Sequence, residues 1–364
     1  MKVGLAVGFL VHLAILLAWD GTWGASLTWQ DDWNRTVKAG KEEGRVAVIG
    51  PVGADRRDAL ALPFQKKYGI SVDYWPGTGR NITPRITTER GARQYLWDVV
   101  IAGALEILLL PLNVLEPLEP ALILPEVKET RYWRGGDMEF LDSKRSIFVM
   151  SPFHRGTLFV NPKLADAKSF RSYKDLLDPQ WKGKIVIDEP RKPGPGQATF
   201  LFFYLHPDLG PDFIRALAGQ DLVILRDYAQ EVDAVAGGKY PVGIGFSDSI
   251  AEQRMRQGVP IAIVDPRDLR EGSDVSPASG QLGLFDNTPH PNAAKVYVNW
   301  LLSREGQTEF TRATGYISNR LDVRTDHAAP WRVPMAGAVK TYGLEARRLG
   351  DEGMNPLLNE VLRR

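Results

Sequence analysis

The sequence predicts an α/β fold whose first part is a parallel sheet covered by helices on both faces. Three apolar runs, "VAVIG", "ISVDYWPG" and "WDVVIAG", have the length and composition of strands, and two helical patterns separate them. Strands and helices that alternate in this order are typical of a parallel sheet. With 364 residues, of which 44% are apolar, the chain is also long enough for two domains.

Local patterns predict the individual elements of this first part. Trp29, Trp33 and Val37 form an apolar stripe with a spacing of four residues, which predicts a helix that Gly44 can end before the first strand. The next helix contains Pro63 and is expected to be kinked or split there. The segment "ITPRITTERGARQYL" is expected to form a polar helix between the second and third strands.

A second set of strands and helices is predicted further along the chain. Two extended runs in "RSIFVMSPFHRGTLFVNP" flank residues 154–156 and indicate a hairpin-like crossing between the two sets. Strands are expected at "KIVIDEP", "YPVGIGFSDS", "VPIAIVDP" and "GQLGLF", and helices at "ATFLFFYL" and "PNAAKVYVNWLLSREGQTEF". The tail from Leu321, with a helical pattern near Glu345, is expected to pack across the body.

The N-terminal residues have the pattern of a secretory leader. Lys2 precedes a mostly apolar run that is short for a spanning helix, so a signal peptide over residues 1–25 is expected, with an uncleaved membrane anchor as the alternative. The absence of cysteine excludes disulfides, thiolate ligands and a lipid-modified cysteine. A net charge of +1 gives no general attraction to nucleic acid or anionic membranes. We therefore expect an exported, periplasmic protein that is soluble once the leader is removed.

Glycines end the three N-terminal strands and indicate where a ligand could bind. Gly50, Gly77 and Gly103 begin the loops "GPVGA", "PGTGR" and "AGA". Ligands of open parallel sheets bind beyond the carboxyl ends of the strands, so the three loops together form one candidate rim. Each glycine alone could simply turn the chain.

A loop rich in charge and glycine follows the strand "KIVIDEP" in the second set. The strand ends in Asp188 and Glu189, and Arg191 lies in the loop behind them. Arg191 is either a ligand clamp, because arginine recognises carboxylates with two hydrogen bonds, or a solvated charge. Asp188 could hydrogen-bond the loop backbone, and free N–H groups of the loop could cap a ligand at the start of the next helix.

Four stretches resemble one known family: "TLFVNPKL", "SYKDLLDPQWKGKIVIDEP", "AVAGGKYPVGIGFSD" and "NTPHPNAAKVYVNWLLSREGQ". In this order and spacing they are similar to the extracellular solute-binding proteins of ABC importers, in the branch that includes ferric-ion binders. The resemblance runs from about Trp29 to Asp322 and implies the two-lobed type II periplasmic-binding-protein fold. Each lobe would be a mixed, mostly parallel sheet flanked by helices, with the ligand in the cleft between the lobes. The implied division is lobe 1 over 26–147 plus 274–320, lobe 2 over 148–273, and a helical tail over 321–364.

The ferric site of this branch is not matched by the sequence. Ferric binders use a tandem tyrosine after the strand that corresponds to "YPVGIG", whereas Phe246, Ser247, Asp248 and Ser249 stand there in this chain. Carboxylates could still hold ferric ion or a ferric chelate, which remains the alternative. Arginines, hydroxyls and amides at the predicted rims fit an anionic or zwitterionic organic solute better, because guanidinium groups repel a bare cation.

The candidate ligand-binding residues come from both rims. They are Gly53, Thr78, Gly79, Arg80, Gly103 and Ala104 in lobe 1, and Arg155, Asp188, Arg191, Phe246, Ser247 and Asp248 in lobe 2. Asp248 could instead be a helix N-cap, and Arg80 an exposed residue at a helix start. No catalytic residue, metal ligand or cofactor is expected, because the five histidines have no metal-ligand spacing and neighbouring strand carboxylates point to opposite faces.

The resemblance also implies the partners. It implies a small-molecule solute and an inner-membrane ABC permease with its cytoplasmic ATPase, and the protein itself is expected to be a monomer that binds no nucleic acid. A ligand-sensing protein without a transport role, or an exported enzyme, would also be compatible with the sequence.

Overall fold

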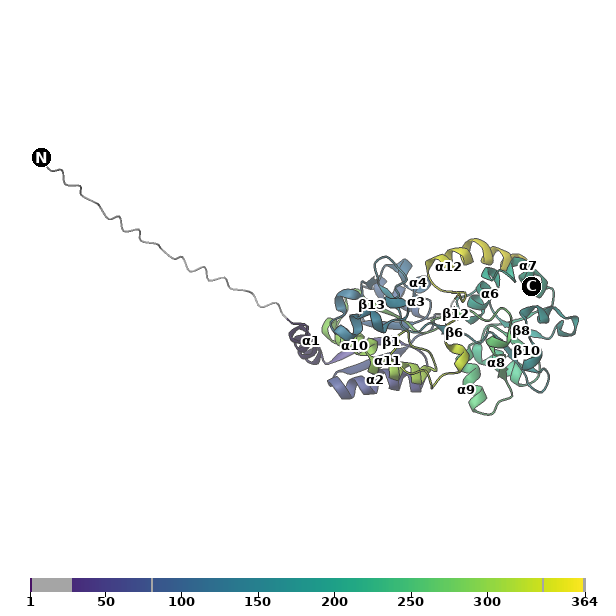
Figure 1. Cartoon of the computed structure of the whole chain (residues 1–364), viewed down its shortest axis with the longest axis horizontal. Coiled ribbons are helices and arrows are strands. Elements are labelled where there is room, and N and C mark those ends of the chain that lie inside the picture. The colour runs from purple at the N-terminus through teal and green to yellow at the C-terminus, as the bar shows by residue number, and fades with distance from the viewer. Residues whose placement is uncertain (2–27, 80, 336, 363–364) are drawn as a thin grey trace.

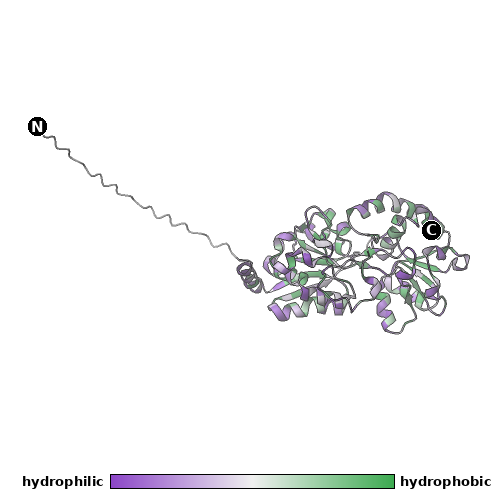
Figure 2. Ribbon diagram, viewed as in Figure 1, coloured by the Kyte–Doolittle hydropathy of each residue, from purple (hydrophilic) through white to green (hydrophobic). Residues whose placement is uncertain are grey.

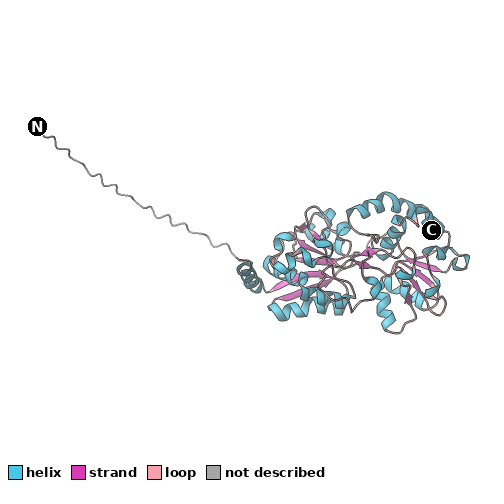
Figure 3. Cartoon of the chain, in the orientation of Figure 1, coloured by secondary structure: helices cyan, strands magenta, loops and turns pink. Residues whose placement is uncertain are grey.

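The computed structural model describes residues 1, 28–79, 81–335 and 337–362, and shows two α/β lobes side by side (Figure 1). The predicted leader falls almost wholly on residues 2–27, which lie outside the described part. Within that part, no helix combines the length and apolar character needed to cross a membrane. Helices surround the strands of each lobe, and the strands are mostly hydrophobic (Figures 2 and 3).

Lobe 1 is built on a mixed sheet. Its three N-terminal strands are parallel in the order β2-β1-β3, as the sequence predicts. A later strand, β13, pairs antiparallel with β3, and two further strands pair antiparallel with β13. The strands are β1 (Arg45–Gly50), β2 (Ser71–Pro76), β3 (Val99–Ala102), β4 (Leu115–Glu116), β5 (Ile147–Val149) and β13 (Gln281–Phe285).

The helices of lobe 1 differ from the prediction in three places. The helix that contains Pro63 is continuous and not split, and the polar helix ends at Gly91 rather than extending to residue 96. The predicted long helix after β13 is two helices, because Ser303 has an extended backbone and its hydroxyl accepts the N–H of Gly306 as the N-cap of the second. The helices are α1 (Trp29–Glu43), α2 (Ala54–Tyr68), α3 (Ile82–Gly91), α4 (Leu105–Leu108), α5 (Pro125–Lys128), α10 (Pro291–Leu302) and α11 (Arg304–Thr314).

Lobe 2 has its own five-stranded sheet in the order β11-β7-β10-β8-β9. The strands β10, β8 and β9 are parallel, whereas β7 is antiparallel to both β10 and β11. The strands are β7 (Leu158–Val160), β8 (Ile185–Asp188), β9 (Val223–Leu225), β10 (Val242–Ile244) and β11 (Ala262–Ile263). The helices are α6 (Pro195–Leu205), α7 (Gly210–Ala218), α8 (Tyr228–Ala236) and α9 (Asp248–Arg256).

Two extended segments join the lobes. The strand β6 (Phe153–His154) of the first segment pairs antiparallel with β12 (Val275–Ser276) of the second. The predicted hairpin around residues 154–156 is therefore wrong: β5 belongs to the sheet of lobe 1, β7 to that of lobe 2, and the segment between them pairs with a strand that is distant in sequence.

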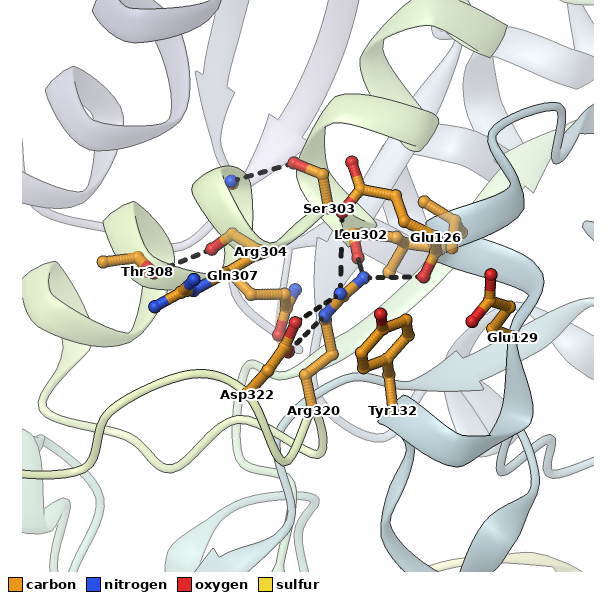
Figure 4. Close-up of polar contacts among 12 residues, drawn as sticks. Glu126, Glu129, Tyr132, Leu302, Ser303, Arg304, Gln307, Thr308, Arg320 and Asp322 are labelled. Carbon is orange, nitrogen blue, oxygen red and sulfur yellow. Dashed lines mark hydrogen bonds and ion pairs between the residues drawn. The ribbon is translucent and has the colours of Figure 1, made fainter.

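The chain leaves lobe 1 at a buried arginine. Arg320 is 1% exposed, and its Nη1 donates to the backbone oxygens of Leu302 at 3.0 Å and Glu126 at 3.1 Å. Asp322 accepts from the other two guanidinium nitrogens, and Tyr132 lies beside the group (Figure 4). Because Leu302 ends α10, the positive charge also lies where the helix dipole favours a cation. This contact fixes the point from which the tail starts.

The tail then packs against both lobes. It contains η9 (Pro330–Arg332), α12 (Leu344–Leu349), the π-helical turn η10 (Gly350–Met354) and α13 (Asn355–Val361). Leu357 and Leu358 belong to the apolar core of lobe 2, whereas Ala328 and Val333 pack against that of lobe 1. The tail is thus part of the packed body.

Candidate ligand-binding site

A cleft of about 780 Å³ lies between the lobes. It is lined by loops that follow strands of both sheets, by the second crossing segment and by the tail. The lining comes from residues 52–56, 77–79 and 102–107 of lobe 1, 193–201 and 247–257 of lobe 2, 276–281 of the crossing segment, and 341–354 of the tail. A volume of this size suits a small organic molecule.

Most of the residues predicted from the sequence are brought together here. Those that line the cleft are Gly53, Thr78, Gly79, Gly103, Ala104, Arg155, Ser247 and Asp248. Arg80 lies outside the described residues. Asp188, Arg191 and Phe246 are described but do not line the cleft.

Two of these residues are buried inside lobe 2. Asp188 is fully buried and its Oδ2 accepts the N–H of Gly196 at 2.9 Å, which holds the start of α6 in place. Phe246 is fully buried and stacks on Phe159. Both side chains were expected at the rim because they stand at or just after the end of a strand, but they point into the lobe.

Arg191 makes its contacts with a neighbouring carboxylate and with the tail. Its Nε donates to Glu189 at 2.6 Å, and its Nη1 donates to the backbone oxygen of Leu362 at 3.0 Å. The hydrogen bonds from Arg191, assisted by Arg226, lower the pKa of Glu189 to about 2 although partial burial opposes this. Both groups are therefore charged at neutral pH.

Three helices begin at the cleft without a side-chain cap. The N-cap residues of α2, α6 and α9 are Gly53, Gly194 and Ser247. The two glycines have no side chain, and the hydroxyl of Ser247 accepts no first-turn N–H. First-turn amides of a helix have no partner within the helix, and the helix dipole adds partial positive charge there. One amide of α6, that of Gly196, is taken by Asp188. The remaining N–H groups make the cleft wall a surface that favours negative charge.

Arg155 adds a buried guanidinium to this wall, with the carboxylate of Asp274 as its ion-pair partner. It follows β6, and only 4% of the residue is exposed. Its Nη1 donates to the oxygen of Pro195 at 3.2 Å and lies 3.6 Å from Asp274, whereas its Nη2 has no hydrogen-bond partner among the described residues. A buried donor without a partner is costly, so a ligand that accepts from it would be favoured.

Asp248 is the first residue of α9, and the N-cap position that was its alternative role belongs to Ser247. It is 4% exposed, and its Oδ2 accepts from Nη1 of Arg332 at 2.9 Å. Burial opposes ionisation, but the charges of Arg332 and Arg155 hold the pKa of Asp248 below its ordinary value. The carboxylate is thus ionised and already neutralised by an arginine of the tail.

Several lining residues were missed from the sequence. The tail supplies Tyr342, Gly343 and Arg347, and the second crossing segment supplies Pro277 and Ala278. The run "SPASG" before β13 has the small residues of a close-packed turn and could have indicated the crossing segment. The tail residues carry no such signal, because their place depends on packing far from their position in sequence.

Two α/β lobes around a cleft define the class of two-lobed binding proteins. The chain belongs to the bacterial extracellular solute-binding protein family, whose sequence model matches residues 59–336. The resemblance seen in the sequence is therefore confirmed. A weaker match, 28% identity over 140 residues, is to an uncharacterized protein of Haemophilus influenzae and spans 38% of each chain.

Solved structures share the type II periplasmic-binding-protein fold. The periplasmic binding protein AfuA from Actinobacillus pleuropneumoniae, with bound fructose-6-phosphate, has a TM-score of 0.64 and 18% identity over 88% of this chain and 98% of its own. Iron-bound HitA from Pseudomonas aeruginosa has a TM-score of 0.64 and 20% identity over 87% and 99%. The Trichodesmium protein IdiA (FutA), with iron and citrate, has a TM-score of 0.63 and 18% identity over 87% and 99%. Because these sequence identities are low, the likeness to these structures shows a shared fold and nothing more.

Proposed function

We propose that this protein is the periplasmic solute-binding component of an ABC importer and captures a small anionic or zwitterionic organic solute between its lobes. It would then deliver the solute to an inner-membrane permease that works with a cytoplasmic ATPase. The observation that carries the proposal is the cleft wall itself. The N-termini of α2, α6 and α9 and the buried Arg155, whose Nη2 has no acceptor among the described residues, all line this cleft and favour a negative group in it.

One acidic group of the cleft, Asp248, supports the same choice. Asp248, at the place of the tyrosine pair of ferric binders, is paired with Arg332 and is therefore not a free ligand for a cation. Among the described residues there is no group of three or more His, Asp or Glu side chains placed to hold a metal ion. AfuA was solved with a sugar phosphate, and IdiA with iron and citrate, so both an organic anion and a ferric chelate belong in the test.

We also propose that the two crossing segments act as the hinge between lobe 1 and lobe 2. The pairing of β6 with β12 supports this, because a two-stranded ribbon between two separately cored bodies can bend without disturbing either core. A solute that contacts both walls would then favour the closed arrangement by its greater affinity for it.

The experiment starts with native mass spectrometry of protein purified without refolding, to find a co-purified solute. Calorimetry then measures that solute, fructose-6-phosphate, citrate and ferric citrate against the parent and Arg155→Met. Losing the buried contact should weaken binding of the preferred anion at least tenfold, or about 1.4 kcal/mol.

Arg215→Met is the control, since Arg215 is an exposed arginine of lobe 2 that does not line the cleft and its loss should change affinity little. Equal affinity of Arg155→Met and the parent would contradict the anion site. Tight binding of ferric ion without any organic partner would replace it with a metal site, and chemical conversion of the solute would indicate an enzyme.

A further inference from the structure

The end of the chain forms a third wall of the cleft. We call residues 341–362 the C-terminal strap. Its residues Tyr342, Gly343, Arg347, Gly350 and Met354 line the cleft together with walls from the two lobes. In Figure 1 the helix α12 lies at the upper side of the molecule, between the labels of α4 in lobe 1 and α7 in lobe 2. The strap therefore spans the region where the lobes face each other.

One end of the strap is held in lobe 2 by apolar burial. Met354, Leu357 and Leu358 are at most 6% exposed and belong to the core of that lobe. The backbone oxygen of Leu362 accepts from Arg191 at 3.0 Å. Separating this end would expose several apolar side chains at once, so it should stay with lobe 2 when the lobes move.

The other end is held to lobe 1 by polar contacts and by Tyr342, which is 8% exposed and shares an apolar cluster with Val149 of β5. The N–H of Gly343 donates to Oε1 of Glu106 at 3.1 Å, and Nη1 of Arg347 donates to the backbone oxygen of Glu106 at 2.8 Å. Glu106 is 3% exposed and lines the cleft. The hydrogen bonds at Gly343 and Arg347 can exchange with water at small net cost, whereas the buried Tyr342 should stay with lobe 1.

The same carboxylate also contacts the first residue of β13 in lobe 1. Its Oε2 accepts from Nε2 of Gln281 at 2.8 Å, and Oε1 of Gln281 accepts the N–H of Leu105 at 2.6 Å. Glu106 therefore links α4 and β13 of lobe 1 to the strap. A change in the angle between the lobes would act on its contact with the strap and leave the contact with Gln281 in place.

We propose that Glu106 is a positioning residue of the solute site, which latches the part of the C-terminal strap after Tyr342 to lobe 1, although the far end of the strap is anchored in lobe 2. Opening of the cleft breaks the latch at Gly343 and Arg347, and this part of the strap turns away from lobe 1 about Tyr342. This inference rests on the proposed function only in taking the cleft as the solute site, and its test needs no solute.

The absence of cysteine allows labels to be placed without removing native thiols. Spin labels at Leu344→Cys on the strap and Lys128→Cys on lobe 1 report the latch, and a second pair at Leu344→Cys and Asp212→Cys on α7 reports the anchor in lobe 2. All three positions are exposed. The distances between the two spin labels of each pair are measured by electron paramagnetic resonance in the parent, in Arg347→Met and in Glu106→Ala.

We expect both variants to show a second, longer distance population between strap and lobe 1, with the distance between strap and lobe 2 unchanged. Arg347→Lys retains a donor and should keep most of the parent distribution. Arg348→Met is the matched control, because Arg348 pairs with Glu345 and Glu352 within the strap. Circular dichroism and the melting temperature establish that each variant is folded.

Two results would overturn the proposal. If the distance between strap and lobe 2 changes while that between strap and lobe 1 stays fixed, the strap belongs to lobe 1. If Arg347→Met and Glu106→Ala both match the parent and Arg348→Met in both distances, Glu106 does not latch the strap. Neither result would bear on anion binding by Arg155, which the calorimetric experiment tests separately.

Discussion

Replacement of Arg332 by methionine should destabilise the protein strongly. Arg332 is 1% exposed and lies between two carboxylates of α9: Nη1 donates to Asp248 at 2.9 Å and Nη2 to Glu252 at 2.6 Å. Its guanidinium also faces the ring of Phe153 at 5.0 Å. Methionine retains the apolar stem but leaves the buried carboxylate of Asp248 without its closest partner.

The expected loss is about 3 to 5 kcal/mol of unfolding free energy, the usual cost of removing one partner of a buried ion pair. Urea denaturation with fluorescence detection measures it. Arg267→Met is the control, because Arg267 makes an equally short ion pair with Asp265 at an exposed position, where no measurable change is expected. The double variant Arg332→Met with Asp248→Asn should be more stable than Arg332→Met alone, since it no longer has the unpaired, buried carboxylate of Asp248.

The pH dependence gives an independent check. In the parent the pKa of Asp248 is lowered, so the stability that its ionised carboxylate contributes is present above the ordinary pKa of 3.8 and is lost as the pH falls. Without Arg332, burial should raise this pKa above its ordinary value, and the carboxylate should then destabilise the variant at neutral pH. The difference between parent and variant should therefore be larger at pH 7.5 than at pH 5. A loss no greater than that of Arg267→Met, or a difference that does not change with pH, would refute this account of the ion pair.

Two further predictions concern the crossing segments. His154 is buried: its Nδ1 contacts the oxygen of Ser273 at 3.1 Å, its Nε2 accepts the N–H of Met335 at 3.2 Å, and burial lowers its pKa. The stability that the neutral imidazole contributes is therefore present above about pH 6.5 and should be lost as the pH falls through the lower folded pKa. Urea denaturation at pH 7.5 and 5.5 should show this loss, and an equally steep pH profile in His154→Gln would contradict it. Gly103→Ala should lower the unfolding free energy by about 1 to 3 kcal/mol in thermal unfolding, because a Cβ there would lie 2.1 Å from the oxygen of Ala278. Gly91→Ala is the control and should be neutral or stabilising, because Gly91 has open space around it. Equal effects of the two substitutions would exclude the close approach as the cause.

The elements that the sequence predicted well are those determined by local pattern. The helix α1 begins and ends where the apolar stripe and Gly44 place it, and the three N-terminal strands pair as their alternation with helices predicts. The break at Ser303 was missed because good helix formers, Leu302 and Arg304, stand directly on both sides of it. The hairpin near residue 155 was wrong because the partner of β6 lies about 120 residues further on, in β12, and such pairing leaves no local mark.

The candidate site could be predicted only in part. The loops after strands were identified because a parallel sheet fixes where its strands end, and Gly53, Gly103 and Ser247 all line the cleft. The direction of a side chain at the end of a strand was not predictable, as Asp188 and Phe246 show by pointing into the lobe. The pairing of Asp248 with Arg332 spans 84 residues and has no periodicity that a sequence could reveal.

The charge preference that we propose for the cleft arises from the fold before any individual side chain is considered. In each lobe a helix follows a strand directly, as α2 follows β1, α6 follows β8 and α9 follows β10, so that the positive end of each helix lies at the carboxyl edge of its sheet. The cleft lies between these two edges. A protein of this fold that binds a cation must therefore supply free anionic donors to overcome the helix ends. In this chain Asp248 is paired with Arg332, whereas Nη2 of Arg155 has no acceptor among the described residues, and both observations support our proposal of an anion rather than a cation in the cleft.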